Sequence, residues 1–96
     1  MVIWSQPATD DLKHIHDFIA KDSKHYAKKV VQDIRDKTNI LEALPNTGKM
    51  VPEIGNPNIR ELHIYSYRIM YEVLHDHPYV LTIIHKRRDF TPKDLP

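Results

Sequence analysis

Residues 59–74 read IRELHIYSYRIMYEVL, and this stretch decides the fold. Apolar and polar side chains alternate over Ile59–Ile64 and again over Tyr67–Leu74, which is the period of a strand with one face toward a core. Tyr65-Ser66 between the two segments is short enough to turn the chain. The stretch therefore predicts a pair of neighbouring antiparallel strands.

Two further segments have strand character. Tyr79–His85 is rich in Val, Leu and Ile and follows a predicted turn at His75–Pro78, while Met1–Trp4 can add a strand at an edge. Short links between the three consecutive strands predict an antiparallel meander. Pro45 to Pro57 reads as a loop that holds both glycines of the chain, and long loops in compact domains are often functional.

The first half of the chain predicts two helices joined by a short turn. The first follows a cap at Ser5 or Gln6 and carries one apolar stripe: Ala8, Leu12, Ile15 and Ile19. The second is longer, follows a cap at Asp22 or Ser23, and is ended by Pro45. Its apolar face is expected to consist of Ala27, Val30, Ile34, Leu41 and Leu44.

The predicted order of elements is β-α-α-β-β-β. This is an α+β fold in which an N-terminal strand and an antiparallel helical hairpin pack on an antiparallel sheet. The hairpin covers one sheet face, and the other stays open unless a partner or the tail covers it. Thr91–Asp94 resembles a capping-box start, so a short last helix is expected there.

Composition excludes several classes of protein. The chain has 96 residues, 41% hydrophobic and 28% charged, so we expect one soluble domain over residues 1–96. It lacks cysteine, which excludes disulfides and thiolate sites. Apolar runs are too short to span a bilayer and no signal peptide is visible, so a cytoplasmic protein without a membrane partner is expected. The seven histidines lack the spacing of a metal site, so neither metal nor cofactor is predicted.

Two arginines on consecutive strands are candidates for anion binding. Arg60 and Arg68 could form a fork for phosphate or carboxylate, because guanidinium binds both in a bidentate way. Equally, either could form an ion pair within the sheet, with Glu61 or Glu72. Whether the two arginines meet depends on the strand register, which the pattern does not fix.

The end of the last strand concentrates positive charge. Residues 85–93 contain one acid, Asp89, and four cations, Lys86, Arg87, Arg88 and Lys93. The net charge of the whole chain is only +1. Cationic neighbours would favour a neutral His85, as a general base requires. Alternatively, His85 is a polar strand end and the charges are a solvated tail.

Taken in order, these motifs resemble the RelE/ParE superfamily of toxins from bacterial type II toxin–antitoxin systems. The resemblance covers nearly the whole chain and implies the RelE-like toxin fold. It rests on five segments: Trp4–Ala8 with the start of the first helix, the loop Pro45–Glu53, Ile59–Leu62, Tyr67–Tyr71 and His85–Asp89.

The resemblance implies a growth-inhibiting toxin of the plasmid-stabilisation type. A cognate antitoxin would neutralise it by wrapping it with a helical, partly disordered segment, and a higher-order toxin–antitoxin complex is compatible with this. We expect that segment to dock in the groove between the helical hairpin and the sheet. The target is DNA gyrase for ParE-like members, or the ribosome and its mRNA for RelE-like endonucleases.

The residues favour the ParE-like mode, with the RelE-like nuclease as the alternative. A nuclease would use Arg68, His85 and Arg87 as catalytic residues. However, Ile59 and Glu61 stand where RelE carries catalytic lysines, and no tyrosine follows His85. The near-neutral charge also suits a protein target better than RNA. The expected target-binding residues are Lys49, Arg60, Arg68, Arg87 and Arg88.

Overall fold

The computed structural model describes residues 1–88 and 90–95. Asp89, the last residue of one sequence motif, therefore lies outside the described part of the chain. In chain order the elements are β1 (Ile3–Trp4), α1 (Gln6–Ala20), α2 (Lys24–Asn39), the 3-10 turn η1 (Ile40–Glu42), β2 (Lys49–Met50), β3 (Ile59–Ile64), β4 (Tyr67–Leu74), β5 (His77–His85) and the 3-10 turn η2 (Pro92–Asp94).

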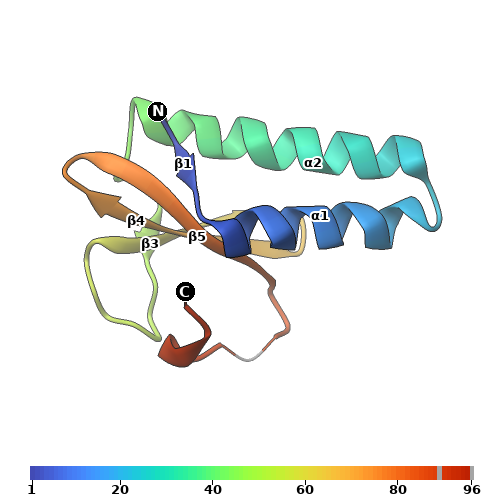
Figure 1. Cartoon of the computed structure of the whole chain (residues 1–96). Coiled ribbons are helices and arrows are strands. Elements are labelled where there is room, and N and C mark those ends of the chain that lie inside the picture. The colour runs from blue at the N-terminus through green and yellow to red at the C-terminus, as the bar shows by residue number, and fades with distance from the viewer. Residues whose placement is uncertain (89, 96) are drawn as a thin grey trace.

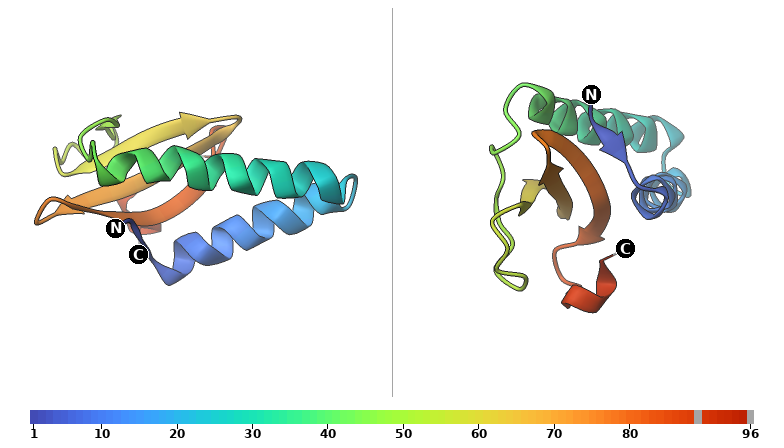
Figure 2. Two further views of the ribbon diagram at one scale, coloured as in Figure 1. Left: turned by 90° about the horizontal axis from the view of Figure 1, so that it is seen from above. Right: turned by 60° about the vertical axis from the view of Figure 1, so that its left-hand side comes forward.

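The elements form layers on a curved sheet (Figure 1). Helices α1 and α2 lie side by side over one face, and the C-terminal segment with η2 lies on the other side of the sheet (Figure 2). This is the predicted α+β fold, with a helical hairpin packed on a sheet. The described residues contain no helix that is both long enough and apolar enough to cross a membrane.

The sheet has five strands in the order β1-β5-β4-β3-β2. Strands β2 to β5 pair in antiparallel fashion as predicted, but β1 runs parallel to β5, with Ile3 opposite Tyr79. The expectation of a wholly antiparallel sheet is therefore wrong at this edge. Ser5 sets the direction of β1, because its N–H donates to the Val80 carbonyl (2.9 Å) and its hydroxyl to the Leu81 carbonyl (2.8 Å).

Both helices begin where the sequence predicts. Ser5 accepts a hydrogen bond from the Ala8 N–H, and Ser23 accepts one from the Tyr26 N–H, so each serine satisfies a free donor of a helix start. The apolar stripes meet the sheet in the main core. Its buried residues are Ala8, Leu12, Ile15, Val30, Ile34, Leu41, Leu62, Ile69, Tyr71, Val80 and Ile83.

A second, smaller core covers the opposite sheet face. Loop residue Val51 and tail residue Phe90 pack there against side chains of β3, β4 and β5, namely Ile59, Met70 and Ile84. The expectation that the tail could close this face is confirmed. The predicted short helix is present as η2, in which the Thr91 N–H donates to the Asp94 carboxylate (3.0 Å).

Three local predictions are corrected. Helix α2 ends at Asn39 and continues as η1, so Leu44 is not on its apolar face but 60% exposed. The loop contains β2, whose two residues are too few to show alternation. The predicted turn at His75–Pro78 is only two residues long, because His75 and Asp76 both have positive φ (51° and 63°) and close a tight hairpin.

Candidate functional site

Arg68 is held between two carboxylates on the sheet face that points away from the helices. Its guanidinium uses one edge, Nε and Nη2, to donate to Glu61 at 3.2 and 2.7 Å. The other edge, Nη1 and Nη2, donates to Glu53 at 2.7 and 2.9 Å. Each carboxylate thus accepts two hydrogen bonds from the guanidinium, which is the bidentate geometry that this group favours.

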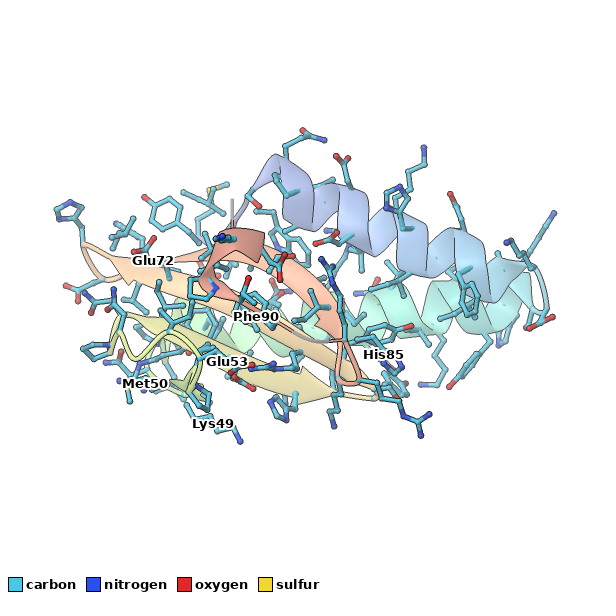
Figure 3. All side chains as sticks on the ribbon, turned by 90° about the horizontal axis from the view of Figure 1, so that it is seen from below. Lys49, Met50, Glu53, Glu72, His85 and Phe90 are labelled. Carbon is cyan, nitrogen blue, oxygen red and sulfur yellow. The ribbon has the colours of Figure 1, made fainter. Side chains whose placement is uncertain are left out.

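Arg68, Glu61 and Glu53 form an ion-pair cluster on the same sheet face as the second core. The side chain of Glu61 is 2% exposed and that of Arg68 is 12% exposed. His63, directly opposite Arg68 on β3, also binds Glu61, and the Phe90 ring lies 5.7 Å from the guanidinium carbon. Figure 3 views this face, with Glu53 and Phe90 labelled over the sheet. Of the two roles predicted for Arg68, the ion pair with Glu61 is the one present.

The cluster shifts the pKa of each of its acids. Hydrogen bonds from Arg68 lower the pKa of the Glu53 carboxyl below its ordinary value. Burial alone would raise the pKa of Glu61, but hydrogen bonds from Arg68 and His63 outweigh it, so this pKa is also lowered. Hydrogen bonds to Glu53, and then to Glu61, raise the pKa of Arg68. All three groups are charged at neutral pH.

His85 lies on the other face of the sheet. It is paired with Tyr67, whereas Arg68 is paired with Ile84, and consecutive residues of a strand point to opposite faces. The His85 ring packs edge-on against Tyr67, with 5.7 Å between ring centroids. Its Nδ1 accepts the Arg87 backbone N–H at 3.1 Å. The sheet therefore separates two of the three residues that a nuclease would use.

Arg60 is also separated from Arg68. It lies opposite Tyr71 on the helix-facing side, so the two arginines do not share a site. Its Nη1 donates to the Gly48 carbonyl at 2.8 Å, and within the described residues its buried Nε has no hydrogen-bond partner. Arg60 thus holds the loop in place. Neither Glu61 nor Glu72 pairs with it.

Gly48 has no room for a side chain. A Cβ there would lie 2.6 Å from the Glu61 carbonyl and 2.6 Å from the Tyr71 hydroxyl. The Tyr71 hydroxyl accepts the Gly48 N–H and donates to the Pro45 carbonyl, each at 2.8 Å. A core tyrosine therefore fixes the loop that precedes Lys49.

The remaining predicted target-binding residues are exposed. Lys49 stands on β2 at the sheet edge, opposite Glu61. Arg87 and Arg88 follow the end of β5, and Arg88 lies 3.6 Å from the Asp94 carboxylate with its side chain 58% exposed. These three cations are available for a partner, in contrast to Arg60 and Arg68.

A groove that the sequence patterns did not predict in detail lies at the end of the helical hairpin. Two adjoining cavities of about 300 and 310 Å³ share Phe18, Tyr67 and His85 in their walls. Phe18 is 69% exposed between them, and Lys21 lies over its ring. One signal was present in the sequence, since Phe18 stands off the apolar stripe of α1.

The groove has largely apolar and aromatic walls, with one cation, Arg88, in the lining of the second cavity. Tyr26 and Tyr65 line one cavity, and His14 and Arg88 line the other. The acid in the second cavity, Asp11, is already engaged, because its carboxylate accepts the Thr82 hydroxyl at 2.7 Å and the Ile83 N–H at 3.0 Å. The groove therefore suits a partner segment with apolar and acidic side chains.

Comparison with known proteins agrees with this architecture. A family model described as ParE toxin of type II toxin–antitoxin system, parDE, matches residues 2–90. Among solved structures, the chain is similar to one of the chromosomal ParDE toxin–antitoxin system from P. aeruginosa. The two share 25% identity and a TM-score of 0.72, over 88% of this chain and 92% of that chain.

A second solved structure shares the fold. It is a chain of the RelB–RelE antitoxin–toxin complex from Methanococcus jannaschii, with 21% identity and a TM-score of 0.57, over 88% of this chain and 91% of that chain. No curated protein matches the sequence.

The ion-pair cluster predicts acid sensitivity. Because the pKa values of Glu53 and Glu61 are lowered on folding, their stabilising effect is present above the ordinary glutamate pKa of 4.5 and is lost as pH falls through the lowered values. Urea unfolding between pH 7 and pH 3 should therefore show a free energy of unfolding that falls below pH 4.5, and less steeply in Glu53→Gln.

Glu72→Gln is the matched control for this experiment. Glu72 stands on the same sheet face, but within the described residues it forms no ion pair. This variant should keep the steep acid dependence of the parent protein. If the free energy of unfolding falls equally steeply with pH in Glu53→Gln and in the parent protein, the role given to Glu53 is contradicted.

Proposed function

This chain belongs to the family of ParE toxins of type II toxin–antitoxin systems, and we propose that it inhibits growth by binding DNA gyrase rather than by cutting RNA. The family match over residues 2–90 and the likeness to a ParDE chain support this mode. The proposal places the protein in the cytoplasm, where gyrase acts on DNA.

The observation that carries the proposal is the separation of Arg68 from His85. In-line attack on a phosphodiester needs a base and a phosphate-binding cation within reach of the same phosphate group. Here the two side chains stand on opposite faces of one sheet. Arg68 also has both edges occupied by its own carboxylates.

His85 is poorly arranged as a base in any case. Its Nδ1 accepts a hydrogen bond from the Arg87 backbone, so in the neutral ring the proton is on Nε2. That nitrogen can then donate but cannot accept a proton. This arrangement supports a binding role for His85 in the wall of the groove.

The exposed cations are the proposed contacts with the target. Lys49, Arg87 and Arg88 are exposed and can meet acidic groups of a target, although Arg88 also lies near Asp94. Arg60 and Arg68 instead support the loop and the second face from within. The five residues predicted to bind the target therefore divide into three contacts and two supports.

The proposed antitoxin site is the groove around Phe18. The solved relatives are a ParDE system and a RelB–RelE complex, which supports an antitoxin partner for this chain as well. An amphipathic segment could insert an apolar side chain into each cavity and set acidic side chains against His14 and Arg88. Exposed aromatic side chains in such a position are typical of binding hot spots.

Purified protein should inhibit DNA supercoiling by gyrase at micromolar concentration. In a parallel reaction, a defined mRNA on translating ribosomes should remain intact, because Arg68 and His85 stand on opposite faces of the sheet. Absence of inhibition at this concentration, or cleavage of the mRNA in the ribosomal A site, would contradict the proposal and favour the nuclease alternative.

Charge reversal should separate target contacts from general charge effects. Arg87→Glu should raise the concentration for half-inhibition of gyrase by about tenfold, equivalent to roughly 1.4 kcal/mol. Lys13→Glu changes the net charge equally at an exposed position of α1 and should have little effect. If both variants lose activity equally, Arg87 is not a specific contact.

Phe18→Ala should weaken antitoxin binding while leaving the fold intact. Removing an aromatic anchor costs about 2 kcal/mol or more, so the dissociation constant measured by calorimetry should rise roughly 30-fold. Leu44→Ala, at the other end of the hairpin and similarly exposed, is the matched control. Unchanged affinity in Phe18→Ala would remove the groove as the antitoxin site.

A further inference from the structure

The two carboxylates bound to Arg68 differ in how firmly they are held. Glu61 is on β3, is 2% exposed, and is also bound by His63. Glu53 is in the loop and its side chain is 33% exposed. Among the described side chains, Arg68 is the only one to which it is hydrogen-bonded. One carboxylate is a fixed part of the sheet, and the other reaches the fork from outside.

The turn that carries Glu53 is held without it. The Val51 carbonyl accepts the N–H groups of Ile54 (3.1 Å) and Gly55 (3.0 Å), and Gly55 supplies the positive φ of 70° that closes the turn. Val51 is fully buried in the second core, and Ile54 packs against it. Glu53 can therefore rotate away from Arg68 by a change of side-chain rotamer, with the backbone in place.

Rotation of Glu53 would leave an edge of Arg68 ready to bind an acid. Nη1 and Nη2 would keep their orientation, because Nε and Nη2 remain on Glu61 and Phe90 lies against the guanidinium. The exposed edge is already shaped for a planar carboxylate, since it holds one in a bidentate way. A singly charged carboxylate would replace Glu53 without changing the charge beside Glu61, whereas a doubly charged phosphate would add repulsion.

We propose that the Nη1/Nη2 edge of Arg68 is a carboxylate-binding site, filled by Glu53 in the free protein and taken over by an acidic side chain of a protein partner. Glu53 is then an internal competitor. The exchange conserves charge and hydrogen bonds, so it is set by the relative affinities of the two acids. The apparent affinity for the partner is then the intrinsic affinity multiplied by the fraction of molecules in which Glu53 is released.

Acetate is a suitable probe because it carries only the carboxylate. The experiment follows the Arg68 Nε–Hε resonance by NMR while sodium acetate replaces sodium chloride at constant ionic strength. Glu53→Gln and Glu53→Ala should bind acetate at least about tenfold more tightly than the parent protein. Glu72→Gln removes one carboxylate from the same face without freeing Arg68, and should behave as the parent.

Three results would overturn the proposal. The Arg68 resonance in both Glu53 variants could respond to acetate no more than to chloride. Inorganic phosphate could bind these variants more tightly than acetate does, which would assign the site to phosphate instead. Finally, amide shifts of residues 51–55 could show that the turn unfolds in both variants, which would make Glu53 a structural support rather than a displaceable acid.

Discussion

The ion pair between Arg68 and Glu61 is the interaction on which the second face of this sheet depends. A guanidinium that is 12% exposed needs compensating charge, because an unpaired cation in such a place costs several kcal/mol. The carboxylates of Glu61 and Glu53 supply it and connect β3, β4 and the loop. Beside this cluster, Val51 and Phe90 close a second core on a face that would otherwise be open to water.

The two-residue period of a strand then determines what the site can do. Arg68 faces the second core, so the preceding residue Tyr67 must face the helices. His85 lies opposite Tyr67 on β5 and therefore faces the helices as well. A sheet that buries both faces cannot bring Arg68 and His85 to one substrate without losing one of its cores. The same alternation of faces places His85 beside Phe18, in a groove with apolar walls that Arg88 also lines. This arrangement is the structural basis for our proposal that the protein binds its target and does not cut RNA.

Local patterns predicted the hairpin Ile59–Leu74 to the residue, since alternation and a two-residue turn are both encoded within it. They also offered an ion pair within the sheet, of Arg60 or Arg68 with Glu61 or Glu72, as the alternative to an anion-binding fork. Other features depend on contacts between distant segments. Glu53 approaches Arg68 from a loop without periodicity, and the direction of β1 follows from the bonds of Ser5 to β5. The groove at Phe18 exists only once the hairpin lies against the end of the sheet, although an apolar residue off the helix stripe was a visible sign of it.

The most direct test of this account is the coupling free energy between Arg68 and Glu61. A double-mutant cycle with Arg68→Met, Glu61→Gln and the double variant, unfolded in urea at pH 7, measures it. Each single variant should lose up to roughly 3–5 kcal/mol, because it removes one partner of a buried ion pair and leaves Arg68 with Glu53 alone, or Glu61 with His63 alone. The double variant should lose clearly less than the sum, with a coupling of about 2 kcal/mol or more. Additive losses, with a coupling near zero, would show that this ion pair does not hold the second face.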